Sequence, residues 1–573
     1  MRRVPARGLF FGGGLFGGAR HRSFQRRRYY SVSDDSNRNN NDTAVASVLG
    51  PEPLEREGGE NLPALTKIVA TVGPVSESKE MVQRLVHGGM HVMRINFSHA
   101  TYEEAEMRIN NLKQASGRHT AAMGSRSPNM RAVLLDTQGP EVRTGIFAEE
   151  KIPVEAGQTI TLTSDETAKE ASTLDNLYVN YPSLASTVER GNQILLDDGL
   201  ISLHVLEVDG QAGRVVCECE NAAMLGSRKG VTLPGITLTD LPALTDKDKK
   251  DIAWGMRHDV DFIALSFVRT GDDVATAKRF VENQHDAIHG AGAKHALPQL
   301  ISKIENAASL ENFESILEES DGIMVARGDL GVEIAYSKVS RAQKLIIKRC
   351  RDVGKPVIVA TQMLESMSQN PRPTRAEVSD VTNAVYDGAD CVMLSGETAN
   401  GKYPAEALSA MWKVTQNNDR ARQPLSAPPT TQMSSNAAVA EAAVSIAAGI
   451  YAKAIVVLTR SGTTARLVAK YRPKDAIVIA YCTDAKIARQ LILFRGVHPI
   501  VDDQGEAEKL RKRYGVRGVK MLHESFETRP RSAVKLAQKL NLLNAGDKIV
   551  IISEDADSAE FAGVTGIRVG QCA

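Results

Sequence analysis

The chain has 573 residues, of which 42% are hydrophobic and 24% charged, a balance that excludes disordered, collagen-like and disulfide-rich classes of protein. At about 150 residues per domain, this length predicts roughly four domains, or fewer if one is a large barrel. The six Cys are sparse and irregularly spaced, which favours free thiols in a reducing compartment. No apolar run approaches the about 20 residues of a membrane-spanning helix, so no membrane partner is expected.

The net charge of +1 conceals a basic N-terminus, because residues 1–33 contain eight Arg and no Asp or Glu. This composition predicts an organelle-targeting peptide over residues 1–30 and a disordered linker over residues 31–60. A mitochondrial address is expected, with a plastid or cytoplasmic location as alternatives, and a basic arm that binds RNA or a membrane surface is the rival interpretation. Without the peptide the chain would carry 62 basic and 69 acidic residues, a net charge of −7 that argues against a nucleic-acid partner.

From Leu65 onward, short apolar runs alternate with longer helical patterns, which indicates parallel strands joined by crossover helices. Eight such runs predict an α/β protein with a (β/α)8 barrel, in parts over residues 61–144 and 233–423. The runs are 67–72, 91–95, 132–136, 261–266, 298–304, 321–326, 356–361 and 390–395.

Two further domains are expected. Short alternating stretches between the third and fourth runs predict a small all-β insertion over residues 145–232, placed to act as a lid. A linker rich in Pro and Ser is expected over residues 424–436, and a separate three-layer α/β domain over residues 437–573.

Polar residues stand at or just after the ends of the predicted barrel strands, where barrels of this type carry their active sites. Lys303 and Glu305 are two apart on a strand and therefore share one face. Glu305 with Asp329 would suit Mg²⁺, which takes few protein ligands, although a structural ion pair of Lys303 is the alternative. The remaining strand-end residues are Arg94, Asn96, Ser98, Asp136, Thr137, Arg327, Gly328, Thr361, Gln362, Ser395, Gly396 and Glu397.

Arg94, Asn96 and Ser98 alternate along one strand end and therefore face the same side. An Arg fork grips phosphate in a bidentate manner. The oxygens of Asn96 and Ser98, with those of Asp136 and Thr137, would form a cage for a monovalent cation, or else serve as ordinary helix caps.

Long motifs between about Thr66 and Asn417 resemble the pyruvate kinase family: TKIVATVGP, MRINFSHA, LLDTQGPEVRTG, DDGLISL, LISKIEN, SDGIMVARGDLGVEI, VIVATQMLESM and MLSGETANGKYP. The resemblance implies a barrel with an inserted β lid and a C-terminal regulatory domain, assembled as a homotetramer. It also implies transfer of a phosphoryl group from phosphoenolpyruvate to ADP, giving pyruvate and ATP in glycolysis. The alternative is a catalytically inactive regulatory subunit of the same family, and a second rival is a magnesium-dependent lyase acting on related substrates.

The resemblance also implies a role for each matching residue. The residues implied in the reaction itself are Lys303, Arg94, Thr361 and Ser395. Those implied in substrate binding are Arg94, Lys303, Gly328, through its backbone N–H, Asp329, Thr361 and the lid residue Asp198. Those implied in nucleotide binding are Asn96, His99, Arg143 and Lys229. The metal ligands would be Glu305 and Asp329 for Mg²⁺ (or Mn²⁺), and Asn96, Ser98, Asp136 and Thr137 for K⁺, with Glu141 typical of potassium-dependent members.

Three features stand apart from this pattern. Gln138 replaces the Lys that is usual in the family beside the potassium site. A sugar-phosphate effector is expected at a loop that follows a strand and opens a helix, Thr459, Arg460, Ser461, Gly462, Thr463 and Thr464, with a simple helix cap as the alternative. The acidic stretch at 553–566 would repel a second phosphate, so an effector other than fructose 1,6-bisphosphate, or none, is equally compatible with the sequence.

Overall fold

The computed structural model describes residues 64–117, 129–238, 240–293, 295–421, 434–501, 528–555 and 564–573. The expected targeting peptide (1–30) and the linker after it (31–60) lie outside the described residues, as does most of the acidic stretch at 553–566. The expected linker at 424–436 is described only from Ser434. There helix α15 (Ser435–Ile450) begins, two residues earlier than expected, because the Ser434 hydroxyl accepts the Ala437 N–H.

The eight apolar runs form eight parallel strands of one closed barrel, as the sequence predicts. Around the barrel the order is β1-β16-β15-β14-β13-β12-β3-β2, with β2 returning to β1. The strands are β1 (Lys67–Thr71), β2 (Val92–Asn96), β3 (Ala132–Asp136), β12 (Phe262–Leu265), β13 (Gln299–Ile304), β14 (Gly322–Ala326), β15 (Val357–Ala360) and β16 (Cys391–Leu394). The register of β2 and β3 places Asn96 opposite Asp136, so two of the expected site residues are neighbours.

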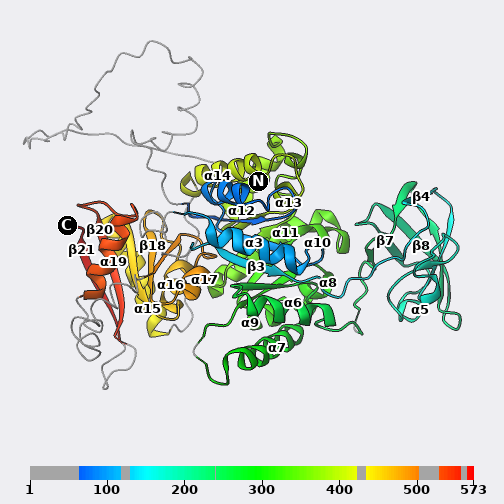
Figure 1. The fold of residues 1–573 in the computed structure, drawn as a ribbon, viewed down its shortest axis with the longest axis horizontal. Coiled ribbons are helices and arrows are strands. Elements are labelled where there is room, and N and C mark those ends of the chain that lie inside the picture. The colour runs from blue at the N-terminus through cyan, green and yellow to red at the C-terminus, as the bar shows by residue number, and fades with distance from the viewer. Residues whose placement is uncertain are drawn as a thin grey trace, which may run out of the picture. The chain divides into compact units, whose positions relative to one another are not determined.

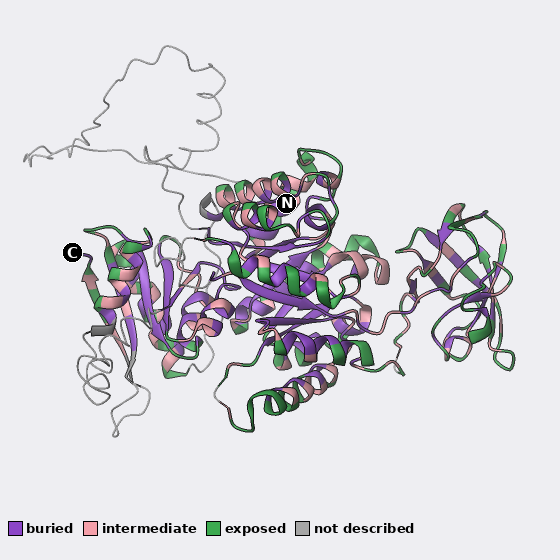
Figure 2. Ribbon diagram, viewed as in Figure 1, coloured by how far each residue is buried: buried purple, intermediate pink, exposed green. Residues whose placement is uncertain are grey.

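Helices follow the strands and cover the outside of the barrel (Figure 1). Several begin with a reciprocal capping box, for example at Thr101, Thr245 and Thr374, which fixes where each chain segment leaves the barrel rim. Their apolar faces pack on the strands while their polar faces remain exposed (Figure 2). The longer helices are α2 (Lys79–His87), α3 (Tyr102–Gln114), α6 (Asp246–Arg257), α7 (Gly271–His289), α11 (Tyr336–Val353), α12 (Arg375–Asp387) and α14 (Pro404–Ala421).

Short helices occupy the carboxyl ends of several strands, where the expected site residues are placed. They are α8 (Ala307–Glu311) and α9 (Phe313–Glu319) after β13, α10 (Arg327–Glu333) after β14, η2 (Glu365–Ser368) after β15 and α13 (Gly396–Ala399) after β16.

The insertion between β3 and β12 is built mainly of antiparallel strands, as expected. A six-stranded sheet has the order β11-β7-β8-β9-β5-β6, and β10 pairs with β4. The strands are β4 (Lys151–Val154), β5 (Thr159–Thr163), β6 (Leu177–Tyr178), β7 (Gln193–Leu196), β8 (Ile201–Asp209), β9 (Arg214–Cys219), β10 (Ala223–Gly226) and β11 (Val231–Thr232), with the short helices η1 (Glu166–Ala168) and α5 (Leu184–Thr187). Cys217 and Cys219 lie buried in its core as free thiols, in agreement with a structural role.

The C-terminal domain has three layers, with a five-stranded sheet of order β19-β18-β17-β20-β21 between helices. The central strand β17 is covered by helices on both faces of the sheet. Ile455 and Val457 pack towards α15, α16 and α17, whereas Val456 packs towards α19. Strands buried on both faces read as continuous apolar runs. The remaining elements are β17 (Ala454–Thr459), α16 (Thr463–Lys470), β18 (Ile477–Cys482), α17 (Ala485–Leu491), β19 (Val497–Val501), α19 (Thr528–Lys539), β20 (Lys548–Asp555) and β21 (Val564–Gln571).

The C-terminal domain also contributes to the barrel itself. Ile492 and Leu493, just after α17, belong to the apolar cluster formed by the inward-facing residues of the barrel strands. Beside them Arg495 pairs with Asp419 of α14 at 2.7 Å, with both side chains at most 5% exposed. No helix in the described part of the chain is long and apolar enough to cross a membrane.

Candidate active site

A buried ionic cluster occupies the carboxyl ends of β2, β3 and β13. The Asp136 carboxylate accepts a hydrogen bond from Arg94 Nε at 2.6 Å and lies 3.2 Å from Lys303 Nζ. Lys303 also donates to the Ser266 hydroxyl at 2.8 Å and lies 2.8 Å from Glu305 Oε1. The residues are drawn from strands far apart in sequence, so closure of the barrel is what brings two cations and two carboxylates together.

Burial and charge set the protonation of this cluster. Burial opposes ionisation of Asp136, but Arg94 and Lys303 outweigh it and hold its pKa below the usual value. Burial likewise opposes the charge of Lys303, but Asp136 and Glu305 hold its pKa above the ordinary range. Burial, assisted by the charge of Asp329, raises the pKa of Glu305 to about 7, since Lys303 divides its charge between two carboxylates.

The Glu305 carboxylate has capacity for a further cation. Its Oε2 accepts the Phe267 N–H at 2.6 Å, whereas Oε1 is buried and, within the described residues, accepts no hydrogen bond, with the Lys303 ammonium as its close partner. Two neighbouring carboxylates, Glu305 and Asp329, fit Mg²⁺, which completes its shell with water and phosphate oxygens. In the described ranges, no group of three or more His, Cys, Asp or Glu is placed to hold a metal ion.

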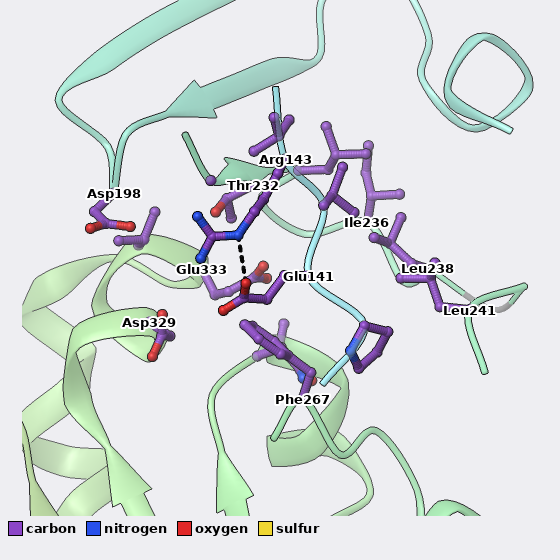
Figure 3. A pocket seen from close by; sticks show the side chains of 18 of the residues that line it. Glu141, Arg143, Asp198, Thr232, Ile236, Leu238, Leu241, Phe267, Asp329 and Glu333 are labelled. Atoms are coloured by element: carbon purple, nitrogen blue, oxygen red, sulfur yellow. Dashed lines mark hydrogen bonds and ion pairs between the residues drawn. The ribbon is translucent and has the colours of Figure 1, made fainter. Parts of the chain in front are cut away.

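Next to this cluster is a cavity of about 320 Å³, whose lining comes from the barrel loops and from the base of the insertion (Figure 3). It brings together six residues named from the sequence: His99, Glu141, Arg143, Asp198, Lys229 and Asp329. Burial, with the negative charges of Asp329 and Asp197, raises the pKa of Asp198. Carboxylates from the insertion and from the barrel thus face the same cavity and repel one another unless a cation lies between them.

Asn96 is not among the lining residues of this cavity. Its side-chain oxygen accepts the Ser98 N–H at 3.1 Å, and the backbone oxygen of Asp136 accepts the Phe97 N–H at 3.0 Å. The structure therefore places Asn96 with the oxygen donors expected to hold a monovalent cation. Alkali cations bind amide, hydroxyl, carboxylate and carbonyl oxygens, and Asn96, Ser98, Asp136 and Thr137, at two adjacent strand ends, carry oxygens of these kinds.

Gln138 takes part in a small network beside these residues. Its side-chain amide donates to Glu141 Oε2 at 3.2 Å, and Arg143 Nε donates to the same oxygen at 2.6 Å. Glu141 is thus neutralised by one guanidinium and solvated by a neutral amide, where the usual family residue would add a second positive charge.

The loops after β14 and β15 are joined to each other. Gly328 N–H donates to the Thr361 hydroxyl at 2.7 Å, so the N–H expected to be offered to substrate has an internal partner in this structure. Thr361 has φ +68°, a strained value for a β-branched residue, and Arg327 Nη2 donates to its carbonyl at 2.8 Å. On the next strand end, the buried Ser395 hydroxyl has no hydrogen-bond partner among the described residues.

The expected effector loop forms a tight turn at the end of β17. Gly462, at φ +83°, donates its N–H to the Thr459 hydroxyl at 2.9 Å, and the Ser461 and Thr463 hydroxyls are 2.9 Å apart. Helix α16 begins after Gly462, which has no side chain to cap it, and the Ser461 hydroxyl accepts the Thr463 N–H at 3.4 Å at the start of the helix.

Sequence reasoning missed several residues of the site, among them Glu333, Ser266 and Phe267. Glu333 lies four residues after Asp329 on α10, and burial together with the charge of Asp329 raises the pKa of Glu333 to about 7. The i,i+4 spacing of two acids on a predicted helix was the available signal. Ser266 and Phe267, at the end of β12, follow the same strand-end rule that identified the other residues.

The fold and the buried ionic cluster beside the cavity define the class as a (β/α)8-barrel enzyme. Comparison with known proteins identifies the class more closely. The family model described as the pyruvate kinase barrel domain matches residues 64–408, and that of the pyruvate kinase alpha/beta domain matches residues 437–562. The chain belongs to the pyruvate kinase family, and it is a phosphotransferase.

Individual relatives agree with this assignment. A cytosolic pyruvate kinase isozyme of Glycine max is 42% identical over 508 residues, which cover 85% of this chain and 93% of the relative. The pyruvate kinase of Geobacillus stearothermophilus is 45% identical over 437 residues, covering 76% and 71% of the two chains. The crystal structure of a pyruvate kinase from Cryptosporidium parvum superposes with a TM-score of 0.77 at 35% identity, covering 89% of this chain and 96% of that one.

Proposed function

We propose that this chain transfers the phosphoryl group of phosphoenolpyruvate to ADP, giving pyruvate and ATP in glycolysis, with Mg²⁺ (or Mn²⁺) and K⁺ as cofactors. The observation that carries the proposal is the buried cluster of Arg94, Lys303, Asp136 and Glu305 beside the cavity that Asp329 lines. Phosphoryl transfer needs mainly positioning and charge neutralisation, and fixed cations beside a substrate cavity supply both.

The proposed roles follow from position. Arg94 holds the phosphate of phosphoenolpyruvate, and Asp136 fixes the guanidinium by its 2.6 Å hydrogen bond. Lys303 neutralises charge on the migrating phosphoryl group and on the enolate oxygen. A Mg²⁺ ion at Glu305 and Asp329 would supply further neutralisation of the substrate's carboxylate and phosphate. Thr361 and Ser395, at the ends of the neighbouring strands β15 and β16, transfer the proton that converts enolpyruvate to pyruvate.

The second substrate, ADP, binds in the cavity. His99, Arg143 and Lys229 contact the nucleotide phosphates, and Asp198 closes with the insertion over the site. The insertion thereby serves as a lid that excludes water, which protects the phosphoryl group from hydrolysis. Asn96, Ser98, Asp136 and Thr137 hold K⁺.

Regulation, assembly and location complete the proposal. The loop from Thr459 to Thr464 binds a sugar-phosphate effector, because it joins strand β17 to the N-terminus of helix α16, where backbone N–H groups favour an anion. The active form is a homotetramer. Residues 1–33, which are basic and contain no Asp or Glu, direct the chain to an organelle, and the mitochondrion is the location we favour.

The proposal predicts pyruvate formation from phosphoenolpyruvate and ADP that requires both Mg²⁺ and K⁺. A lactate dehydrogenase-coupled assay measures it, with each cation omitted in turn at constant ionic strength and with a panel of sugar phosphates added afterwards. Activation by one sugar phosphate, abolished by Arg460→Ala, would support the effector loop. Absence of turnover under every condition would contradict the catalytic proposal and favour the inactive regulatory subunit.

A second prediction concerns pH. Because burial raises the pKa of Glu305 to about 7, a divalent cation must displace a proton below neutrality, so its affinity should fall by up to about tenfold per pH unit below pH 7. Electron paramagnetic resonance of free Mn²⁺ measures the affinity between pH 6 and pH 8 without turnover. Glu305→Gln should bind Mn²⁺ weakly with no such pH dependence, and equal wild-type affinity at both limits would contradict the assignment.

The raised pKa of Glu305 also makes the stability of the metal-free chain depend on pH. Glu305 binds its proton more tightly in the folded state than in the unfolded state. Its contribution to stability is therefore complete below its ordinary pKa of 4.5 and is lost as the pH rises through about 7. Glu305→Gln should remove this component of the pH dependence.

A further inference from the structure

Helix α6 touches both of the loops that would hold the monovalent cation. One loop, residues 96–99, follows β2, and the other, residues 136–139, follows β3. The two contacts come from consecutive residues in the first turn of α6, Lys247 and Asp248. Consecutive helical residues point about 100° apart, so one turn can reach two separate loops.

Lys247 holds the first loop. Its ammonium donates to the Phe97 carbonyl at 2.7 Å and to Asp251 at 2.6 Å. The second oxygen of Asp251 accepts the Tyr102 hydroxyl at 2.9 Å, and the Asp251 side chain is 1% exposed. Burial and this hydrogen bond raise the pKa of Tyr102 to about 12, so the hydroxyl remains a donor at neutral pH. The Lys247 side chain is 45% exposed, but these two hydrogen bonds direct its ammonium to the Phe97 carbonyl.

Asp248 holds the second loop. Its Oδ1 accepts the Gly139 N–H at 3.0 Å, while its Oδ2 accepts both the N–H and the hydroxyl of Thr245 at the start of α6. The residue is fully buried. Gly139 itself has φ +75°, and a side chain there would clash with Ser266, so glycine is required where the loop meets Asp248.

We propose that the first turn of α6, through Lys247 and Asp248, sets the spacing between the two loops and thereby determines the affinity and size selectivity of the monovalent-cation site. Both are positioning residues, because neither supplies a ligand. The inference rests on the proposed K⁺ site and assigns to it residues outside the ligand set. Alkali cations differ mainly in radius, so an oxygen cage distinguishes K⁺ from Na⁺ only if its loops cannot close inward.

The chain contains its own reporter of this loop. Trp254, on α6, stacks on Tyr102 with ring centroids 5.6 Å apart and lies 5.4 Å from the Phe97 ring. Cation binding next to Phe97 should therefore change Trp254 fluorescence without any turnover. The chain has only one other Trp, Trp412, which Trp412→Phe removes.

The test titrates the full chain, in the Trp412→Phe background, with KCl or NaCl at constant ionic strength. Lys247→Met and Asp248→Asn should each weaken K⁺ binding about tenfold, the loss of roughly one hydrogen bond to a charged group, and should reduce the K⁺/Na⁺ affinity ratio. At saturating K⁺ the turnover number should stay within about threefold of wild type, a change of under 1 kcal/mol in the barrier. Lys247→Arg should retain most of the K⁺ affinity.

Lys249→Met is the matched control, because Lys249 lies on the same helix and, among the residues that the structure describes, pairs only with Asp246, at 3.0 Å, whose side chain is 90% exposed. It should leave K⁺ affinity unchanged. Circular dichroism confirms folding of each variant, and Asp248→Asn, which keeps the side-chain shape, provides a second test if Lys247→Met unfolds. Wild-type K⁺ affinity and selectivity in both variants would overturn the role proposed for α6 and leave the proposed K⁺ site intact. Absence of any K⁺ response in the parent chain would overturn the K⁺ site as well.

Discussion

Replacing Lys303 by Met is expected to slow pyruvate formation by about 10²–10³-fold, the usual effect of removing one preorganised charge from a transition state. Lys303 is the cation shared by Asp136 and Glu305, at 3.2 and 2.8 Å, and is only 9% exposed. No solvent cation can replace it at that position. Steady-state kinetics with phosphoenolpyruvate and ADP, at saturating Mg²⁺ and K⁺, measure the change.

Two further measurements separate a chemical role of Lys303 from a structural one. The variant should fold, as judged by circular dichroism, although loss of the ammonium leaves Asp136 and Glu305 facing each other. Lys303→Arg keeps the charge but not the geometry, so it should be impaired less than Lys303→Met. Turnover of Lys303→Met within about tenfold of wild type, a barrier change of roughly 1.4 kcal/mol, would show that the role assigned to Lys303 is wrong.

The second large effect is expected on stability. Arg495→Met should lower the free energy of unfolding by about 3–5 kcal/mol, because it removes one partner of a buried ion pair and leaves the other charge uncompensated. Arg495 donates to Asp419 at 2.7 Å, and the same carboxylate accepts the N–H groups of Leu65 and Thr66 at 3.0 and 2.9 Å. Urea unfolding followed by circular dichroism measures the loss.

A surface arginine provides the matched control. Arg84 lies 3.7 Å from Glu406 with 58% of its side chain exposed, so Arg84→Met should change stability by only a small fraction of the Arg495 effect. Adding Asp419→Asn to Arg495→Met should restore part of the loss, because the amide oxygen still accepts the backbone N–H groups and no charge is left buried. An unfolding midpoint of Arg495→Met equal to that of wild type would refute this account.

The barrel could be predicted from the sequence because its strands are buried on both faces. Runs such as 132–135 and 322–326 therefore contain no polar side chain, and this signal is local. The site residues were recognisable for the related reason that polar side chains at the ends of apolar strands have no packing role. Pairings such as Arg94 with Asp136 could not be read from the sequence, because they depend on the neighbour relations that barrel closure creates.

Residues that act through other residues escaped sequence reasoning. Lys247 and Asp248 lie in a charged stretch, TDKDKKD, that reads as an ordinary exposed helix start, and only the fold shows that Asp248 is buried against Gly139. The hydrogen bond from the Gly328 N–H to the Thr361 hydroxyl, across adjacent strand ends, could likewise not be read from the sequence. Hydrogen bonds between loops depend on tertiary distances, for which sequence spacing gives no measure.

The apolar residues that the C-terminal domain inserts into the barrel have a consequence for synthesis on the ribosome. Ile492 and Leu493 lie about 100 residues beyond the end of the last barrel strand, β16. The ribosome adds about 5–20 residues per second, so roughly 5–20 s pass between synthesis of β16 and synthesis of the side chains that complete the interior of the barrel. The catalytic barrel is thus the first domain to begin and among the last to be finished, and for that interval its open end is a surface that a chaperone can bind.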